Sequence, residues 1–196
     1  MDFLTGCQHF GHRFICDACH RPFQSINQMD KTMLRNYARV KDTDTLFLLG
    51  DFAYRNARPA SSYLKQIKKT TCGQMIYVRG NHDQWLDDMS VDEKQHYFLM
   101  VIDDRCVIER DGFRVGLCHI PTDQFQVPVD LIVCSHIHNN KSGHDFETFM
   151  EIPNILNCGV DISGFAPVTL RELADNNQRF YGRKYDIPEE LFRAFE

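Results

Sequence analysis

Side chains that commonly bind metal ions occur in five short segments of the sequence, each following an apolar run. The segments are Cys7-Gln8-His9, Gly50-Asp51, Gly80-Asn81-His82-Asp83, His119 and Ser135-His136-Ile137-His138. Histidine, cysteine, carboxylate and amide groups are the ligands that divalent cations select in proteins. A single histidine or Gly-Asp pair in such a place is more often part of a turn than a ligand. The pattern repeated five times indicates one shared site.

Two of the segments are more specific than the others. In "GNHD" (80–83) a histidine stands among turn-forming polar residues directly after a buried-type apolar run. In "HIH" (136–138) two imidazoles one residue apart can be aimed at metal ions by a shared face or a tight turn. Glycine directly before Asp51 and before Asn81 lets the backbone turn sharply and present the next side chain.

The apolar runs before these segments have the length and composition of buried strands. They are Met1–Thr5, Thr45–Leu49, Gln74–Val78, the second half of a hairpin over Arg105–His119, and Asp130–Ser135. The hairpin turns at Asp111-Gly112, and Asn154–Cys158 is a further strand. Loops at the carboxyl ends of strands converge at one edge of an α/β sheet, so we expect the five segments to meet there.

Helices are predicted between and after the strands. Capping-box pairs mark three of them: Ser25 with Gln28, Ser90 with Glu93, and Thr169 with Glu172. The first of these is expected to span Ser25–Val40, and further helices are expected over Pro59–Lys69 and Pro188–Phe195. Early alternation of strands and helices followed by a strand-rich second half predicts two packed sheets with helices outside, in a single domain over residues 1–196.

Composition excludes several other classes of protein. The chain has 196 residues, of which 43% are hydrophobic and 25% charged, as in ordinary globular domains. Its net charge of −5 gives no global attraction for a long nucleic acid. The eight cysteines are irregularly spaced and predict free thiols. We expect neither a signal peptide nor a membrane-spanning segment, because the first residues lack the signal-peptide pattern and no apolar run is long enough for a membrane. We therefore expect a cytoplasmic protein; its oligomeric state is left open.

The five segments, as "CQHFGH", "GDFA", "GNHD", "CHIP" and "SHIH", resemble the calcineurin-like metallophosphoesterases. That family has Asp-x-His, Gly-Asp, Gly-Asn-His-Asp/Glu, a lone His, and Gly-His-x-His in this order. The segments "HFGH", "RPF", "LGDFA", "VRGNHD" and "NCGVDISGFAPVTL" are similar to its small bacterial and phage branch, up to about Leu173. The resemblance implies a four-layer α/β/β/α sandwich with two mixed β-sheets. It also implies hydrolysis of a small phosphomonoester or phosphodiester by a metal-bridging hydroxide.

The family pattern implies a site for two divalent ions, Mn, Zn or Fe. Asp51 would bridge both ions, because the two oxygens of a carboxylate can serve two cations. The first ion would be held by Cys7, His9 and His138, and the second by Asn81, His119 and His136. His82 would be the general acid or transition-state stabiliser, positioned by Asp83 or another neighbour, so that His82, Asp51 and Asn81 form the catalytic set.

Two positions depart from the family pattern. Cys7 stands where an aspartate is expected, and Ser135 replaces a glycine. A Cys7 thiolate would favour Zn²⁺ or Fe²⁺ over Mn²⁺ or Mg²⁺, whereas a neutral thiol would weaken the first site. The alternative function is therefore a metal-poor interaction scaffold on the same fold. A nuclease acting on long polymers is disfavoured by the acidic charge, although a dinucleotide or cyclic nucleotide stays possible as substrate.

Other candidate residues have weaker support. His12 and Arg13 follow His9 on what we expect to be the same loop, where they could contact the substrate phosphate. Cys16-x-x-Cys19-His20 matches a haem-attachment or half zinc-site spacing, but no second cysteine pair follows. We interpret these two cysteines as ordinary thiols.

Overall fold

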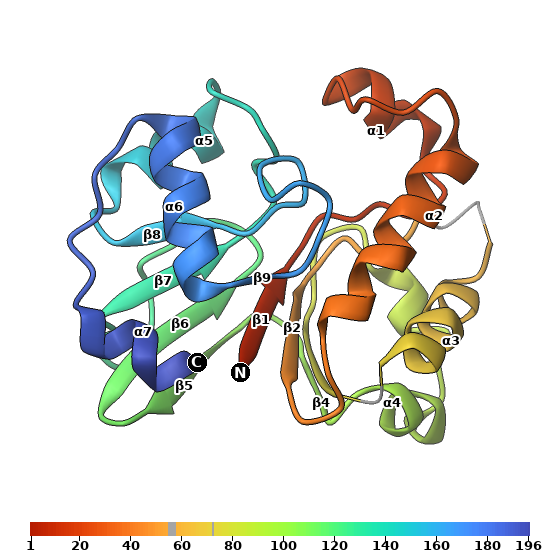
Figure 1. Cartoon of the computed structure of the whole chain (residues 1–196), viewed down its shortest axis with the longest axis horizontal. Coiled ribbons are helices and arrows are strands. Elements are labelled where there is room, and N and C mark those ends of the chain that lie inside the picture. The colour runs from red at the N-terminus through yellow and green to blue at the C-terminus, as the bar shows by residue number, and fades with distance from the viewer. Residues whose placement is uncertain (55–57, 72) are drawn as a thin grey trace.

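A computed structural model describes residues 1–54, 58–71 and 73–196 of the chain (Figure 1). Its strands form two sheets that pack face to face, one of five strands and one of four. The predicted two-sheet α/β architecture is confirmed. No helix in the described part of the chain is long and apolar enough to cross a membrane.

The first sheet is mixed, and its order is β4-β3-β2-β1-β9. The first four of these strands run parallel, whereas β9 is antiparallel to β1. Their bounds are β1 Asp2–Thr5, β2 Thr45–Leu49, β3 Gln74–Val78, β4 Met100–Ile102 and β9 Val168–Thr169. The three parallel strands predicted from sequence occupy the middle of this sheet, so their carboxyl ends share one edge.

The second sheet is also mixed, with the order β5-β6-β7-β8. The hairpin of β5 and β6 is antiparallel and turns at Asp111-Gly112 as predicted, while β6, β7 and β8 run parallel. The bounds are β5 Arg105–Arg110, β6 Phe113–Cys118, β7 Leu131–Cys134 and β8 Ile155–Asn157. This sheet therefore also presents parallel carboxyl ends, those of β6 and β7.

Helices cover the first sheet on the side away from the second (Figure 1). They are α1 Arg13–Ala18, α2 Ile26–Asn36, α3 Ala60–Thr70 and α4 Val91–Tyr97, with short 3₁₀ turns η1 Tyr37–Arg39 and η2 Gln84–Leu86. Ser25 caps α2 by accepting the N–H of Gln28, but the Gln28 side chain accepts from Gln24 and the capping box is only half formed. The helix expected to reach Val40 ends at Asn36 and continues as η1.

The remaining helices lie on the side of the second sheet (Figure 1). They are α5 His144–Glu151, α6 Leu170–Tyr181 and α7 Glu189–Phe195. The predicted capping boxes at Ser90 and Thr169 are both complete. Phe149 of α5 packs on the outer face of the second sheet, whereas Leu173 of α6 and Leu191 of α7 join the core between the sheets.

Alternation along the strands explains why the sheets are buried on both faces. In β2, Phe47 and Leu49 face the core between the sheets, while Leu46 and Leu48 face the helices of the first layer. All four side chains are fully buried. A strand buried on both faces reads as a continuous apolar run, which is the pattern by which it was predicted. The rigid strands fix the loops that follow them.

Candidate functional site

The structure brings the five polar segments together at the carboxyl ends of β1, β2, β3, β6 and β7. Backbone hydrogen bonds join the loop after β1 to the loop after β2, from the Cys7 N–H to the Gly50 carbonyl and from the His9 N–H to the Asp51 carbonyl, each 2.9 Å. The Ser135 N–H donates to the His119 carbonyl at 3.0 Å and joins the loops of the second sheet. The two sheets thus contribute to one cluster of side chains.

Asp51 lies at the centre of this cluster. Its Oδ2 atom is 3.5 Å from His9 Nε2 and 3.3 Å from His119 Nε2, and these imidazoles come from different sheets. The other oxygen, Oδ1, accepts the backbone N–H of His82 at 2.9 Å. One carboxylate oxygen of Asp51 therefore faces both groups of side chains.

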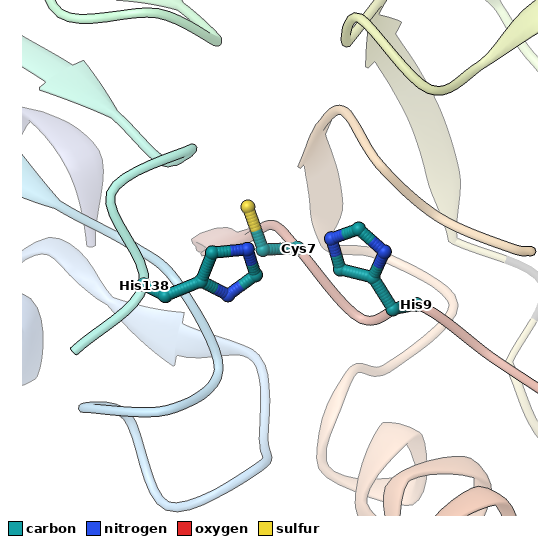
Figure 2. Close-up of side chains that lie close together, drawn as sticks. All are labelled: Cys7, His9 and His138. Carbon is teal, nitrogen blue, oxygen red and sulfur yellow. The ribbon is translucent and has the colours of Figure 1, made fainter. Parts of the chain in front are cut away.

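On one side of Asp51, Cys7 Sγ and the imidazoles of His9 and His138 point toward one another (Figure 2). One ligand atom from each of the three lies within 4.8 Å of the others. His9 Nε2 is buried and has no hydrogen-bond partner in the part of the chain that the structure describes. Because a buried imidazole nitrogen without a partner is costly, this atom is well suited to binding a cation.

On the other side, Asn81, His119 and His136 converge. His119 Nε2 is 3.0 Å from Asn81 Oδ1 and 3.2 Å from His136 Nδ1. Cys7 also lies within 4.8 Å of Asp51 and His119, so its thiol is close to both groups. All seven residues predicted as metal ligands are brought together, and their nitrogen, oxygen and sulfur donors fit divalent transition metals.

The polar atoms behind three of the imidazoles fix which nitrogen faces the cluster. His119 Nδ1 is 2.9 Å from the Leu49 carbonyl oxygen, which only accepts, so Nδ1 carries the proton and Nε2 presents its lone pair. His136 Nε2 is 3.2 Å from the Asp145 carboxylate, which leaves its Nδ1 facing inward. His138 Nδ1 is 2.9 Å from the Asp161 carboxylate, so Nε2 of His138 is left to face the cluster. Such partners typically orient histidine ligands of metals.

Ser135, the second departure from the family pattern, has a definite place in this arrangement. Its hydroxyl donates to the Leu49 carbonyl and is 2.9 Å from His119 Nδ1. The hydroxyl therefore adds a second polar contact behind the His119 ring, beside that of the Leu49 carbonyl. A glycine at this position could not make it.

Burial and mutual proximity set the charge states of the cluster. Burial and the neighbouring His138 lower the pKa of His9 well below its ordinary value, and burial with His119 lowers the pKa of His136. Burial opposes the charged forms of Asp51 and His119 too, but their hydrogen bond and attraction prevail. The pKa of Asp51 is therefore lowered and that of His119 is raised. Burial, reinforced by Asp51, raises the pKa of the Cys7 thiol well above its ordinary value.

Unusual backbone conformations concentrate in these loops. Five residues of the cluster have positive φ angles: Cys7 (55°), His9 (51°), Asp51 (54°), His136 (57°) and His138 (52°). A non-glycine residue in this region costs about 1–2 kcal/mol, so the surrounding structure must hold the loops in place. Such strain is typical of functional sites.

Two residues that sequence analysis did not single out hold the first group of ligands. Arg21 forms a buried ion pair with Asp161, with nitrogen–oxygen distances of 2.8 and 3.0 Å. The Arg21 guanidinium also donates to the carbonyls of Cys7 and Gln8 at 2.9 and 2.7 Å. It therefore links the strained loop after β1 to the carboxylate that orients His138. The signal was present in the segments "RPF" and "NCGVD", which contain these two residues.

Asp83, expected as a partner for His82, is used differently. Its carboxylate accepts the backbone N–H groups of Gly80, Asp51 and Phe52 at 2.7, 2.8 and 3.1 Å, and the indole N–H of Trp85 at 2.8 Å. It thus joins the loops after β2 and β3. His82 is instead positioned by its backbone bond to Asp51, and its ring lies 5.8 Å from that of His9, centroid to centroid.

A cleft of about 350 Å³ opens beside the cluster. Asp51, His82, His136 and His138 line it on one side, and the segment leading into α5 lines the other. His82 therefore shares one opening with Asp51, His136 and His138.

The two residues suggested as phosphate contacts have different positions. The His12 ring lies 5.4 Å from that of His9 and stacks on Tyr54 at 4.2 Å, so it borders the cluster. Arg13 is not on a loop as expected but begins α1, and its guanidinium contacts Asp17 and the Gln24 carbonyl. The structure does not bring Arg13 to the cluster.

The cysteines of the described residues are free, as expected: Cys7, Cys16, Cys19, Cys106, Cys118, Cys134 and Cys158. Cys72 lies outside the described residues. Cys16 and Cys19 are both buried, and Cys19 can approach His138 and Asp161. These two cysteines face different neighbours, because the Cys16 sulfur contacts that of Met29 at 3.5 Å.

Some known proteins are similar to this chain in sequence and in fold. Residues 19–159 match the Calcineurin-like phosphoesterase superfamily domain. The chain is 26% identical over 172 residues to an uncharacterized protein of Methanocaldococcus jannaschii, in an alignment that covers 86% of each. It resembles the crystal structure of a protein of unknown function from Aquifex aeolicus, with a TM-score of 0.67 and 25% identity, over 89% of this chain and 98% of that one.

The family match contains the ligand-type residues after β2, β3, β6 and β7, while Cys7 and His9 precede it. It covers well over half of the 196 residues, and the mixed two-sheet fold agrees with it. The chain therefore belongs to the calcineurin-like phosphoesterase superfamily, a family of metal-dependent phosphoester hydrolases.

Proposed function

We propose that this protein hydrolyses a small phosphomonoester or phosphodiester with two divalent metal ions, Mn, Zn or Fe, held at the shared edge of its two sheets. The observation that carries the proposal is Asp51 Oδ2, which lies 3.5 Å from His9 Nε2 and 3.3 Å from His119 Nε2. A carboxylate oxygen between two groups of nitrogen, oxygen and sulfur donors is an arrangement that can serve two cations. The buried, unpartnered His9 Nε2 supports the same assignment.

In this proposal Cys7, His9 and His138 hold the first ion, and Asn81, His119 and His136 hold the second, with Asp51 shared. When bound, such ions make hydroxide available near neutral pH and neutralise phosphoryl oxygens. Asp145, Asp161 and the Leu49 carbonyl keep the imidazoles in the tautomers that bind cations. The protein thus supplies a preorganised shell whose donors need little rearrangement.

His82 is the proposed proton donor to the leaving-group oxygen. Its side chain lines the same cleft as Asp51, and its backbone N–H is fixed to Asp51 Oδ1 at 2.9 Å. The loop therefore holds the imidazole at the cleft that would receive the ester, without using it as a ligand. The proposal treats residues 1–196 as one domain acting in the cytoplasm, where a reducing environment suits the free thiols.

The test is a reconstitution screen of the purified protein with Mn²⁺, Zn²⁺ and Fe²⁺ against one aryl phosphomonoester and one aryl phosphodiester. We expect hydrolysis of at least one ester. His82→Asn should lower kcat by about 10²–10⁴-fold while bound metal is unchanged. The matched control is His96→Asn on the exposed face of α4, which should keep full activity. Less than one equivalent of metal, with no hydrolysis under any condition, would favour the scaffold alternative.

A further inference from the structure

Among the residues that the structure describes, no strongly basic side chain lines the cleft beside the proposed metal site. It is lined by Asp51, His82 and residues 136–138, 140 and 142–146. Among these described residues there is neither a lysine nor an arginine. The basic groups present are imidazoles, which carry no obligate charge at neutral pH. Any substrate anion must therefore be balanced almost entirely by the bound cations.

Two cationic side chains near the site in the described part of the chain, Lys141 and Arg21, are engaged elsewhere. Lys141 interrupts the lining segment, but its ammonium group donates to the Phe180 carbonyl at 2.7 Å and lies 4.3 Å over the Phe180 ring. Arg21 is buried in its ion pair with Asp161 behind the His138 ring. Both charges are therefore directed away from the cleft.

Arg79 is the nearest cation on the other flank, beside Asn81. It lines a second hollow of about 290 Å³, which is also lined by the proposed metal ligands Asn81 and His119 and by Asp103 and Asp104. Its guanidinium is 2.5 Å from the Asp87 carboxylate. The carboxylates of Asp87, Asp103 and Asp104 compensate the positive charge of Arg79, so this flank adds little attraction for a second anionic oxygen.

The cleft also contains a carboxylate. Asp145 lines it, and its side chain is 48% exposed while one oxygen is 3.2 Å from His136 Nε2. A partly exposed carboxylate repels an additional negative oxygen on the substrate. Phe146 lies next to it in the same wall and is half-buried, so it offers apolar surface to an organic substituent.

From this charge distribution we infer that the preferred substrate is a phosphodiester rather than a phosphomonoester. A monoester carries a charge of about −1.5 to −2 at pH 7, whereas a diester carries one negative charge per phosphate. The ions would attract both, so the rest of the cleft decides between them, and it favours the less charged ester with a second organic group. The inference rests on the proposed function and narrows its substrate class.

The test compares 4-nitrophenyl phosphate with methyl 4-nitrophenyl phosphate on the metal-loaded protein, because the two esters share a leaving group and differ by one methyl group. We expect kcat/KM for the diester to exceed that for the monoester by about tenfold or more. Asn140→Arg, at an exposed position of the cleft wall, should shift the ratio toward the monoester by about fivefold. Gln178→Arg, an equal charge change on the exposed face of α6, should leave the ratio unchanged.

Equal or greater kcat/KM for the monoester in the wild-type protein would overturn the inference and leave the proposed hydrolase function intact. The same conclusion follows if a folded, metal-loaded Asn140→Arg protein keeps the wild-type ratio. Ser142→Lys provides a second cleft variant where Asn140→Arg does not fold, with the same expected direction. Hydrolysis of neither ester with Mn²⁺, Zn²⁺ or Fe²⁺ would overturn the proposed function and the inference together.

Discussion

Cys7 is the residue at which the proposed metal site differs most from the family pattern. Its side chain is fully buried, and Sγ accepts the backbone N–H of His136 at 3.0 Å. Burial and Asp51 raise the pKa of the thiol well above its ordinary value, so the group is protonated until a cation is bound. Since a thiolate is a soft ligand, the site should select Zn²⁺ or Fe²⁺ over Mn²⁺.

Cys7→Asp should therefore raise Mn²⁺-dependent phosphodiesterase activity, on the order of tenfold, because a carboxylate is the harder ligand. The measurement is kcat/KM with Mn²⁺ alongside metal content by mass spectrometry. Cys7→Ser is the matched control, since it removes the thiolate without adding a carboxylate and should lose zinc without gaining manganese activity. Unchanged metal content and turnover in Cys7→Asp would argue against a ligand role for this position.

Asp161 acts through His138 in the proposed site. Asp161→Asn keeps the shape of the side chain but removes the charge that faces His138 Nδ1 and Arg21. We expect about 10–100-fold weaker binding of the first metal ion, as for other partners of histidine ligands. We also expect a loss of about 3–5 kcal/mol in stability, because Arg21 remains buried and unpaired.

Titration calorimetry with Zn²⁺ on the folded fraction measures the metal affinity of Asp161→Asn separately from its loss of stability. Asp17→Asn removes an exposed carboxylate that pairs with Arg13 and should change neither quantity. Wild-type zinc affinity in folded Asp161→Asn would show that His138 does not depend on this carboxylate.

At the scale of elements, the site depends on how closely the loops after β2 and β3 approach each other. A Cβ atom on Gly80 would lie 2.6 Å from the Asp51 nitrogen and still closer to Asp51 Oδ1. Asp83 holds the same two loops together by accepting N–H groups from both. Only glycine permits this approach, which accounts for the glycine before Asn81.

Gly80→Ala should separate these loops, lower metal affinity at least about tenfold and cost about 1–3 kcal/mol in stability. Gly112→Ala at the hairpin turn is the control: its φ of +85° makes alanine costly, but no atom lies within 4 Å of the added Cβ. Denaturant melts and zinc titrations of both proteins give the comparison. Metal affinity lost equally in both variants would contradict a specific role for the close approach.

Elements with a local signal were predicted well from the sequence. The strands before the site and the capping boxes at Ser90 and Thr169 are determined by residues within a few positions of one another. Helices α1 and α5 were not predicted, because neither begins with a capping box or a proline; α5 begins after Gly143 at a φ of +91°. Strand β9 has only two residues and forms through pairing with β1.

The proposed ligand set followed from the family pattern, but the residues that orient its side chains did not. Arg21 and Asp161 are 140 positions apart in sequence, and no local rule connects them. Asp145 faces His136 only because α5 begins at that point of the cleft. The positive φ angles of the site residues likewise depend on tertiary contacts and carry no signal in the sequence.

At the scale of the molecule, an ion pair connects a 3₁₀ helix beside the first sheet with a helix on the side of the second sheet. Arg39 of η1 and Glu172 of α6 approach to 2.6 Å. Burial raises the pKa of Glu172, but the hydrogen bond from Arg39 and the capping N–H of Thr169 outweigh it and lower that pKa below its ordinary value of 4.5. The ionised form is therefore favoured in the folded state.

Because the folded pKa of Glu172 is the lower one, its contribution to stability is present above about pH 4.5 and is lost as the pH falls through the folded value. Glu172→Gln, which keeps a capping side chain, should cost about 0.5 kcal/mol at pH 7, a small amount because both partners are partly exposed. Urea melts at pH 7 and at pH 4 or lower should show this difference shrinking with acidity. A stability difference between the two proteins that grows on acidification would contradict this prediction.

The central claim concerns the whole molecule: two sheets bring their strand ends together so that Asp51 is shared by two cations. Anomalous diffraction from crystals grown with Zn²⁺ or Mn²⁺ tests it most directly. We predict two anomalous peaks about 3.5–4 Å apart, one beside Cys7, His9 and His138 and one beside Asn81, His119 and His136, with Asp51 between them. No peak at this edge, or ions bound only elsewhere on the protein, would contradict the account.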